Sequence, residues 1–299
     1  MSAGRAPAAA GGGNVRIAYQ GEQGAYSEAA ALRFNAHAEP WPCQTFEEVF
    51  AAVESGRAAQ GIVPIENSIG GSIHRNYDLL VQHELPIVGE VELQVSHNLL
   101  AFPGTRLEEI RRVYSHPQGL AQCERFLQKL TGIEIIATYD TAGSAKMIRE
   151  KGIRDAGAIA SARAAEVFGL AVLESGVQDF EENITRFLVV SRTASPPESA
   201  DKTTIVFTLP NTPGSLFKAL SVFALRNIDL TKLESRPIRG RAWEYLFYAD
   251  ISVPRQDLQC ARALVHLAEF ARSLRTLGSY PAWKEPEAGT PGPADAASR

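Results

Sequence analysis

Three strand-turn-helix units follow one another between residues 112 and 168, and each turn carries a side-chain hydroxyl. The predicted strands are the apolar runs at 112–114, 133–137 and 157–160, and the hydroxyls belong to Ser115, Thr141 and Ser161. Each turn leads into a segment with helical periodicity. Strands that alternate with crossover helices build a parallel sheet, so this order predicts an α/β fold.

The first ninety-five residues repeat this order and predict a second lobe. Val15 to Tyr19 reads as a strand, and an Ala-rich helix follows to Phe34. Thr45 to Glu48 has the capping-box pattern that opens a helix to about Glu54. A further apolar run at 61–65 and a turn at 67–72 lead into another helix. We expect one lobe from 15–95 with a strand returning near 186–191, and a second lobe from 96–185.

The pattern changes after residues 192–202, a segment with two adjacent prolines and no periodicity that reads as a linker. Residues 203–283 then follow the order βαββαβ, with helices at 213–226 and 258–274. This order predicts a ferredoxin-like two-layer sandwich. The ends at 1–14 and 284–299, rich in Ala, Gly and Pro, are expected to be disordered tails.

Composition excludes several classes of protein. The chain is 45% hydrophobic and 21% charged with a net charge of -4, as in ordinary soluble globular proteins, and it has no basic stripe for nucleic acid. No run of apolar residues is long enough to span a membrane. Cys43, Cys123 and Cys260 form no CxxC pair and predict reduced thiols in the cytoplasm. The histidines lack metal-ligand spacing, so no metal is expected.

The segment 183–187, Asn-Ile-Thr-Arg-Phe, is the strongest candidate for a site. It precedes the apolar run 188–190 and therefore stands at the mouth of a predicted buried strand. Thr185 places a hydroxyl next to the fixed cation of Arg186, a pairing that suits an anionic small molecule. The alternative is a loop-to-strand junction whose arginine pairs with a surface carboxylate.

Polar residues at the carboxyl ends of the predicted parallel strands could converge on that segment. Ligands bind at this rim in open α/β sheets, and each helix amino end favours an anion by about 0.3 to 1 kcal/mol. Taken singly, each residue could be only a helix cap, a turn residue or a solvated side chain. The candidates at the rim are Asn67, Ser68, Gly71, Ser115, His116, Thr141 and Ser161, and Gln122 lies on the helix that follows His116. Together they predict a cleft that holds a dianion.

Several runs resemble the prephenate dehydratase family. In the α/β part they are 19–27, 64–68, 70–73, 115–118, 140–142, 159–161 and 185–187. In the C-terminal part, Asn211 to Leu216 and Glu234 to Pro237 resemble the two amino-acid-binding signatures of the family's ACT regulatory domain. The resemblance covers residues 15 to about 283 in order.

This resemblance implies conversion of prephenate to phenylpyruvate, with loss of water and carbon dioxide, in phenylalanine biosynthesis. The catalytic part would have two lobes, like a periplasmic binding protein. The implied catalytic residues are Thr185, for the essential hydroxyl, and Asn67, Ser115 and Gln122. Arg186 would meet a substrate carboxylate, Phe187 would pack against the ring or hold the strand, and Ser68, Gly71, His116, Thr141 and Ser161 would add contacts. No cofactor is implied, because formation of the aromatic ring supplies the driving force and the protein mainly orients the substrate.

For the ACT domain, the resemblance implies L-phenylalanine as an effector. The expected binding residues are Asn211, Pro213, Gly214, Ser215 and Leu216, together with Glu234 and Ser235 on the neighbouring strand. Effectors of this fold commonly bind between paired copies, so we expect a dimer or tetramer that associates through its ACT and catalytic domains. The alternative is a domain that serves dimerisation alone.

Two alternative functions remain. The runs 70–79 and 277–281 resemble the branch with the plant enzymes, many of which prefer arogenate, and a plant or algal source would place the chain in the plastid stroma. The short hairpin between Arg236 and Trp243 favours a bacterial-type enzyme that acts on prephenate. The alternative from another class is a non-catalytic amino-acid sensor, against which the intact Thr185-Arg186-Phe187 run argues.

Overall fold

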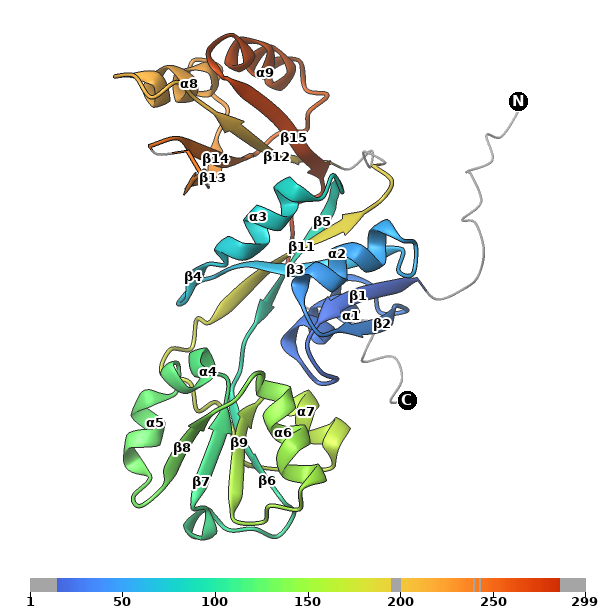
Figure 1. Cartoon of the computed structure of the whole chain (residues 1–299), viewed down its shortest axis with the longest axis vertical. Helices are drawn as coiled ribbons and strands as arrows, with labels where there is room; N and C mark the ends of the chain where they lie inside the picture. The colour runs from blue at the N-terminus through green and yellow to red at the C-terminus, as the bar shows by residue number, and fades with distance from the viewer. Residues whose placement is uncertain (1–14, 195–199, 239, 242, 286–299) are drawn as a thin grey trace, which may run out of the picture.

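The computed structural model describes residues 15–194, 200–238, 240–241 and 243–285. Its parts are stacked along the long axis: lobe 2 (96–183) at one end, lobe 1 (15–95 and 184–194) in the middle, and the C-terminal domain (200–285) at the other end (Figure 1). Nearly all of the two expected disordered tails, and the adjacent prolines of the expected linker, lie outside the described residues.

Lobe 1 is a mixed sheet with three helices. Its strands are β1 (Arg16–Gln20), β2 (Glu39–Cys43), β3 (Gln60–Asn67), β4 (Gly71–Ser72), β5 (Ile87–Gln94) and β11 (Ile184–Ser191). Its helices are α1 (Tyr26–Phe34), α2 (Phe46–Glu54) and α3 (His74–Gln82). The order β5-β11-β3-β1-β2 puts β11 antiparallel between β3 and β5, whereas β1 is parallel to both its neighbours.

Lobe 2 has the same mixture of parallel and antiparallel pairs, in the order β10-β6-β9-β7-β8. Its strands are β6 (Asn98–Ala101), β7 (Arg112–Ser115), β8 (Glu134–Ala137), β9 (Ala156–Ala160) and β10 (Ala171–Glu174). Its helices are α4 (Pro117–Ala121), α5 (Glu124–Lys129), α6 (Thr141–Glu150) and α7 (Ala162–Phe168), with a 3-10 turn, η1 (Leu107–Glu109). Two such α/β lobes joined by two crossings form the expected periplasmic-binding-protein-like arrangement.

The C-terminal domain has the predicted βαββαβ order. It consists of β12 (Lys202–Thr208), α8 (Ser215–Ala224), β13 (Leu230–Pro237), β14 (Tyr245–Ile251), α9 (Leu258–Phe270) and β15 (Ser273–Tyr280). Its sheet, β13-β14-β12-β15, joins that of lobe 1 because Gly278 of β15 pairs with Ile87 of β5. A Cβ at Gly278 would lie 2.2 Å from the Ile87 carbonyl oxygen, so this junction requires glycine.

Side-chain caps start several helices where the sequence predicts them. Thr45 Oγ1 accepts from the Glu48 amide at 3.2 Å, Asp140 Oδ1 from the Gly143 amide at 2.8 Å, and Ser161 Oγ from the Ala164 amide at 3.0 Å. Each bond satisfies an amide that has no partner within its helix. These caps fix the ends of α2, α6 and α7.

Other boundaries differ from the predictions. The helix expected from Pro117 to Leu130 is broken, because Gln122 ends α4 and Cys123 (φ -122°, ψ 24°) precedes α5. The helix expected to reach Leu274 ends at Phe270, and the chain turns there into β15. The strands β2 and β10 were not predicted, and β2 contains two prolines, which are unusual inside strands.

Side chains of β11 alternate between two hydrophobic clusters. Phe187 and Val189 belong to a cluster shared with lobe 2, whereas Leu188 and Val190 belong to one shared with the C-terminal domain. Successive residues of a strand point to opposite faces of the sheet, so β11 is in contact with both neighbouring parts of the molecule. This position makes β11 the central element of the chain.

Candidate active site

A cavity of about 160 Å³ lies where the ends of β3 and β11 meet lobe 2. It is lined by Tyr26, Ser27, Pro64, Asn67, Ile73, Val95, His97, His116, Gln118, Gly119, Gln122, Thr141, Thr185 and Phe187. No Asp, Glu, Lys or Arg is among these described lining residues. The cavity therefore presents neutral amide, hydroxyl and imidazole groups to a ligand.

Thr185 and Asn67 face each other across the antiparallel pair β11–β3. Asn67 Oδ1 accepts from the backbone amides of Ile69 at 3.0 Å and Gly70 at 2.7 Å. Because those amides can only donate, the orientation of the Asn67 carboxamide is fixed, and its Nδ2 donates to Thr185 Oγ1 at 2.9 Å. Thr185 accepts this bond, so its own proton remains available for the cavity.

A closed set of three carboxamides supports this pair. Asn67 Nδ2 also donates to Asn183 Oδ1 at 2.7 Å, Asn183 Nδ2 donates to Gln122 Oε1 at 3.0 Å, and Gln122 Nε2 lies 3.3 Å from Asn67 Oδ1. Gln122 comes from the break between α4 and α5, so the irregular helix turns a lobe 2 amide toward lobe 1. All three side chains are buried, and each holds the others in one orientation.

His97 extends the network beyond Gln122. Its Nε2 lies 2.9 Å from Gln122 Oε1, which can only accept, so Nε2 carries the ring proton. Burial lowers the pKa of His97, and the ring is neutral at pH 7. The Tyr26 hydroxyl lies 3.0 Å from His97 Nδ1 and 2.7 Å from the Ser96 carbonyl oxygen. Burial raises the pKa of Tyr26, so its hydroxyl keeps its proton.

The amino ends of two lobe 2 helices border the same cavity. His116 precedes α4, and its Nδ1 accepts from the Gln118 amide at 3.2 Å, which leaves Nε2–H as the donor of a neutral ring. Thr141 is the first residue of α6, where Asp140 is the cap. Burial raises the pKa of Asp140 above its usual value. Backbone amides at these ends favour an anionic ligand group.

The structure brings six of the predicted site residues to the cavity: Thr185, Asn67, Gln122, His116, Thr141 and Phe187. Ser115, Ser161, Ser68 and Gly71 do not line it. The three serine hydroxyls donate to backbone carbonyl oxygens instead: Ser115 to that of Ile159 at 2.7 Å, Ser161 to that of Gly24 at 2.6 Å and Ser68 to that of Glu182 at 2.8 Å. Gly71 is in β4, opposite Asn67. These residues hold the backbone around the site.

Arg186 requires a correction. Its guanidinium does not line the cavity, because Arg186 follows Thr185 in a strand and points to the opposite face of the sheet. There Arg186 contacts Glu90 at 2.6 Å, Asp250 at 2.6 Å and Glu66 at 3.1 Å. Burial alone would lower the pKa of Arg186, but Asp250, Tyr280 and Glu90 raise it above its usual value. The expected contact between Arg186 and a substrate carboxylate is therefore wrong for this structure.

The predicted effector residues occupy two separate places. Asn211, Pro213, Gly214, Ser215 and Leu216 form the turn from β12 into α8, where Gly214 adopts φ 80°. Glu234 and Ser235 are on β13, and β14 separates β13 from β12. The expectation that the two segments lie on neighbouring strands is wrong. Glu234 itself contacts Ser72 Oγ at 2.7 Å and His74 Nε2 at 3.2 Å.

Neither His97 nor Tyr26 was predicted as a site residue, and Asn183 was included only as the first residue of the candidate segment 183–187. None of the three has a distinctive local signal: Asn183 follows two glutamates, His97 lies between Ser96 and Asn98, and Tyr26 begins a helix.

Some expected features can be compared with the described part of the chain. Within it, no group of three or more His, Cys, Asp or Glu side chains has the arrangement of a metal site. No described helix has the length and hydrophobicity needed to cross a membrane. All three cysteines are buried and unpaired.

Comparison with known proteins identifies relatives. A family model described as prephenate dehydratase matches residues 17–195, and a model of the ACT domain matches residues 203–264. The Arabidopsis thaliana protein arogenate dehydratase/prephenate dehydratase 2, chloroplastic, is 50% identical over 281 residues, which cover 90% of this chain and 74% of that protein.

Two solved structures resemble the whole chain. Prephenate dehydratase from Arthrobacter aurescens in complex with L-Phe has a TM-score of 0.83 and 32% identity, covering 95% of each chain. GqqA, described as a novel type of quorum quenching acylase, has a TM-score of 0.82 and 39% identity, covering 90% of this chain and 98% of its own.

Proposed function

Because this chain belongs to the prephenate dehydratase family, a family of carbon-oxygen lyases in phenylalanine biosynthesis, we propose that prephenate is converted to phenylpyruvate in the cavity between its lobes. The orientation of the Asn67 carboxamide is the observation that carries the assignment of roles. It leaves the Thr185 proton free to donate to a ligand in a site without charged side chains among its described lining residues.

Thr185 donates a hydrogen bond to the ring hydroxyl of prephenate as that group leaves. The carbon–carboxylate bond breaks, its electron pair completes the aromatic ring, and the hydroxyl departs as water with one added proton. The bond that Thr185 accepts from Asn67 polarises its hydroxyl and strengthens its donation. An alcohol is a poor acid, and so is the neutral ring of His116, so the proton itself comes from solvent through a water molecule, and Thr185 stabilises the developing charge.

Prephenate carries two carboxylates, which the helix amino ends and His116 receive. Since no Lys or Arg is among the described lining residues, we assign the donors to the Nε2–H of His116 and to the amides at the amino ends of α4 and α6 that are not already bonded to His116 Nδ1 or Asp140 Oδ1. A departing carboxylate should not be held by a buried cation, because that would stabilise the ground state more than the transition state.

The substrate preference follows from the same lining. Arogenate has an ammonium where prephenate has a ketone, and a buried ammonium requires a carboxylate or several carbonyl acceptors. The described residues that line the cavity include no Asp or Glu. Neutral donors such as Gln118 and His116 suit a ketone, so prephenate is the preferred substrate and arogenate the alternative.

The experiment measures kcat/KM for prephenate and arogenate with the purified full chain. We expect phenylpyruvate formation at a kcat/KM at least about 10-fold above that for arogenate, equivalent to 1.4 kcal/mol of transition-state binding. A higher value for arogenate would reverse the preference and retain the family reaction. Turnover of neither substrate would contradict the enzymatic assignment and favour the amino-acid sensor.

The likeness to GqqA suggests acyl hydrolysis as a second activity to consider. A threonine nucleophile needs a base that takes its proton. Thr185 Oγ1 accepts a bond from Asn67, and no carboxylate or imidazole is bonded to it among the described residues. The geometry therefore favours dehydration over acyl transfer at this cavity.

L-phenylalanine binds the ACT domain and lowers activity in our proposal. The Arthrobacter aurescens relative was solved with L-Phe. The two predicted binding segments are separated by β14 within one copy, which supports a site completed by a second copy. Calorimetry should detect binding of phenylalanine, and kinetics should show inhibition. Neither heat nor inhibition would leave dimerisation as the role of the domain.

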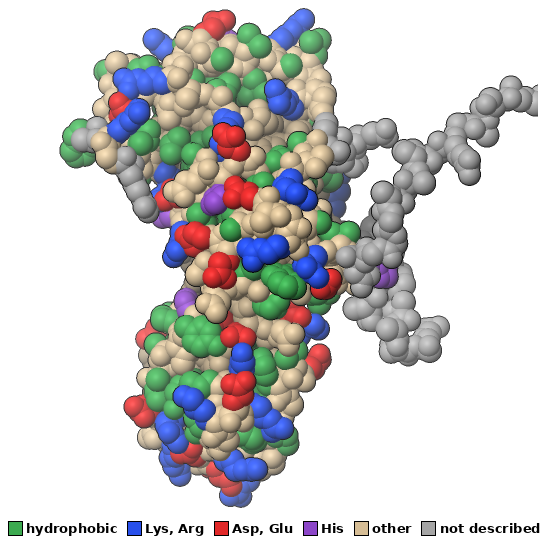
Figure 2. Space-filling model, turned by 45° about the vertical axis from the view of Figure 1, so that its right-hand side comes forward, with side chains coloured by type: hydrophobic (Ala, Val, Ile, Leu, Met, Phe, Trp, Pro, Cys, Tyr) green, Lys and Arg blue, Asp and Glu red, His purple; other side chains and the backbone are tan. Residues whose placement is uncertain are grey.

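The exposed surface of the C-terminal domain supports self-association. Figure 2 shows hydrophobic side chains exposed over this end of the molecule, and Phe217, Leu225 and Val265 are each more than two thirds exposed. The strand β13 is also the last strand of its sheet. A dimer or tetramer would cover these groups, and sedimentation measurements would reveal it.

The compartment follows from the source of the chain. We retain the cytoplasm as the expected location, with the plastid stroma for a plant or algal source, since the Arabidopsis relative is named chloroplastic.

A further inference from the structure

An ion pair between the buried Arg186 and the partly buried Glu66 lies directly behind the Asn67–Thr185 pair. The register of β3 and β11 places Asn67 opposite Thr185 and, one residue along each strand, Glu66 opposite Arg186. Arg186 Nη1 donates to Glu66 Oε1 at 3.1 Å. Successive residues of a strand point to opposite faces of the sheet. The Asn67–Thr185 pair therefore faces the cavity, and the Glu66–Arg186 pair faces the ACT domain.

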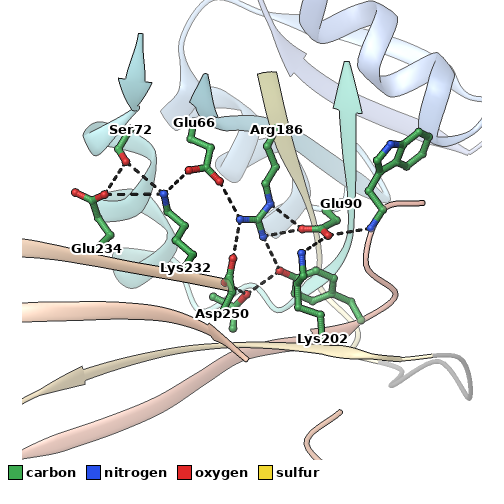
Figure 3. A network of polar contacts seen from close by, with 11 residues as sticks. Glu66, Ser72, Glu90, Arg186, Lys202, Lys232, Glu234 and Asp250 are labelled. Carbon is green, nitrogen blue, oxygen red and sulfur yellow. Dashed lines mark hydrogen bonds and ion pairs between the residues drawn. The ribbon is translucent and has the colours of Figure 1, made fainter. Parts of the chain in front are cut away.

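The ACT domain provides partners for both members of this ion pair (Figure 3). Asp250 of β14 contacts Arg186 Nη1 at 2.6 Å, and Lys232 of β13 donates to the other carboxylate oxygen of Glu66. Asp250 is itself held by Thr204 Oγ1 at 2.7 Å. Arg186, which follows Thr185, is thus paired with β14, and Glu66, which precedes Asn67, is bonded to β13.

The remaining contacts of Arg186 fix its position. Glu90 of β5 binds Arg186 through two nitrogens, at 2.8 and 2.6 Å, and also accepts from Lys202 of β12 at 2.5 Å. Arg186, Glu90 and Asp250 are all less than 10% exposed. In such a site an unpaired charge is costly, so the ACT domain cannot shift away without either moving β11 or breaking these contacts.

A second connection joins the ACT domain to Asn67. Glu234 accepts from Ser72 Oγ at 2.7 Å, and Ser72 belongs to β4, which follows the turn at Ile69 and Gly70. The amides of that turn hold Asn67 Oδ1. The predicted effector residue Glu234 is therefore one short turn from the group that orients Thr185.

We propose that Arg186 is a positioning residue for Thr185, and that Asp250 and Lys232 make the alignment of the Asn67–Thr185 pair depend on the position of the ACT domain. This rests on the proposed function, in which Thr185 acts on the substrate. Movement of the ACT domain when an amino acid binds would be transmitted through two ion pairs to the two strands that carry the site.

The experiment compares three variants of the full chain. Asp250→Asn removes the ACT-domain charge on Arg186 and keeps the size of the side chain, and Lys232→Met removes the ACT-domain partner of Glu66. The matched control is Arg275→Gln: Arg275 also joins the ACT domain to lobe 1, donating to the Leu80 and Val81 carbonyl oxygens, but touches neither β3 nor β11 residues of the site. Readouts are kcat, KM and inhibition by phenylalanine, with phenylalanine binding measured by calorimetry.

Asp250→Asn should lower kcat about 10-fold with KM changed less than about two-fold, because alignment in the transition state is lost and substrate binding is not. Lys232→Met should act in the same direction, and Arg275→Gln should leave both constants within about two-fold. Asp250→Asn should also bind phenylalanine while being inhibited less by it.

Values of kcat for Asp250→Asn and Lys232→Met equal to that of Arg275→Gln would overturn the proposal. If Asp250→Asn does not fold, Lys232→Met decides. Thr185→Ala distinguishes failure of the proposed function from failure of the coupling. Full activity of Thr185→Ala contradicts the proposed role of Thr185. Loss of activity in Thr185→Ala, together with an unchanged kcat in Asp250→Asn and Lys232→Met, contradicts only the coupling to the ACT domain.

Discussion

Two buried polar networks lie on opposite faces of β3 and β11, and they differ in charge. The network toward lobe 2 consists of Asn67, Gln122, Asn183, Thr185 and the neutral ring of His97. The network toward the ACT domain contains three cations and four carboxylates: Arg186, Lys202, Lys232, Glu66, Glu90, Glu234 and Asp250.

The difference in charge indicates different roles: the neutral network is arranged to bind a ligand, and the charged network supports the strands behind it. In the neutral network, fixed carboxamides leave the Thr185 proton without a protein acceptor among the described residues. In the charged network, the guanidinium of Arg186 is fully engaged by three carboxylates and the Tyr280 hydroxyl, and no capacity remains for a ligand. A fixed cation beside a hydroxyl in sequence is therefore not a substrate contact when the two are adjacent in a strand.

The largest expected effect comes from the charged network. Arg186→Leu should lower the free energy of unfolding by about 3–5 kcal/mol, because Glu90 and Asp250 remain buried with one partner fewer. Chemical denaturation followed by circular dichroism measures this. Arg16→Leu is the control: its 2.8 Å contact with Glu39 is partly exposed and should contribute less than about 1 kcal/mol. Equal losses in the two variants would show that burial of the network does not matter.

Loss of the cavity hydroxyl should affect rate and leave stability nearly unchanged. Thr185→Ala should reduce kcat about 10²- to 10³-fold, as for removal of one donor to a developing oxyanion. Thr185→Ser keeps the donor and should retain activity within about 10-fold. Steady-state kinetics with prephenate provide the measurement, and unfolding curves that match the original protein provide the control. A Thr185→Ala protein with near-original turnover would remove Thr185 from the mechanism.

A charge introduced into the neutral network should have a smaller effect. Gln122→Glu places a carboxylate oxygen against Asn67 Oδ1, which the Ile69 and Gly70 amides prevent from rotating away. The unsatisfied contact should cost about 1–3 kcal/mol and reduce kcat roughly 5- to 150-fold. Gln118→Glu also changes a lining residue but breaks no bond of this network and serves as the comparison. A larger loss in Gln118→Glu would mean that charge in the cavity, and not the network, is the cause.

Much of the fold could be predicted because its signals are local. The caps at Thr45, Asp140 and Ser161 and the change to a βαββαβ order after the linker all depend on residues close in sequence. The β2 strand could not, since Pro40 and Pro42 contradict strand propensity and only its pairing with β1 makes it a strand.

The site was predicted less completely, for two physical reasons. Arg186 was assigned to the cavity although the strand period of two, already visible in the sequence, directs it away from Thr185. Asn183 and His97, by contrast, are bonded to Gln122, and the break between α4 and α5 that turns Gln122 inward has no clear local signal.

The smallest expected effect is on the pH dependence of the free energy of unfolding, which should differ between the two networks. Burial holds the pKa of His97 below the 6.5 of a free imidazole, so below pH 6.5 the unfolded chain binds a proton that the folded chain refuses. The free energy of unfolding should therefore fall as pH decreases from 7.5 to 5.5. His97→Gln removes this titration and should show a smaller fall, measured by urea unfolding, and subtraction of the two curves cancels the other histidines. For Glu66, burial alone would raise the pKa, but its bonds to Lys232 and Arg186 lower it below 4.5, so the stability that the charged network gains from this carboxylate is lost only in more acidic solution. Identical pH dependence of His97→Gln and the original protein between pH 7.5 and 5.5 would show that His97 is not held neutral, and the lowered pKa assigned to its ring would then be wrong.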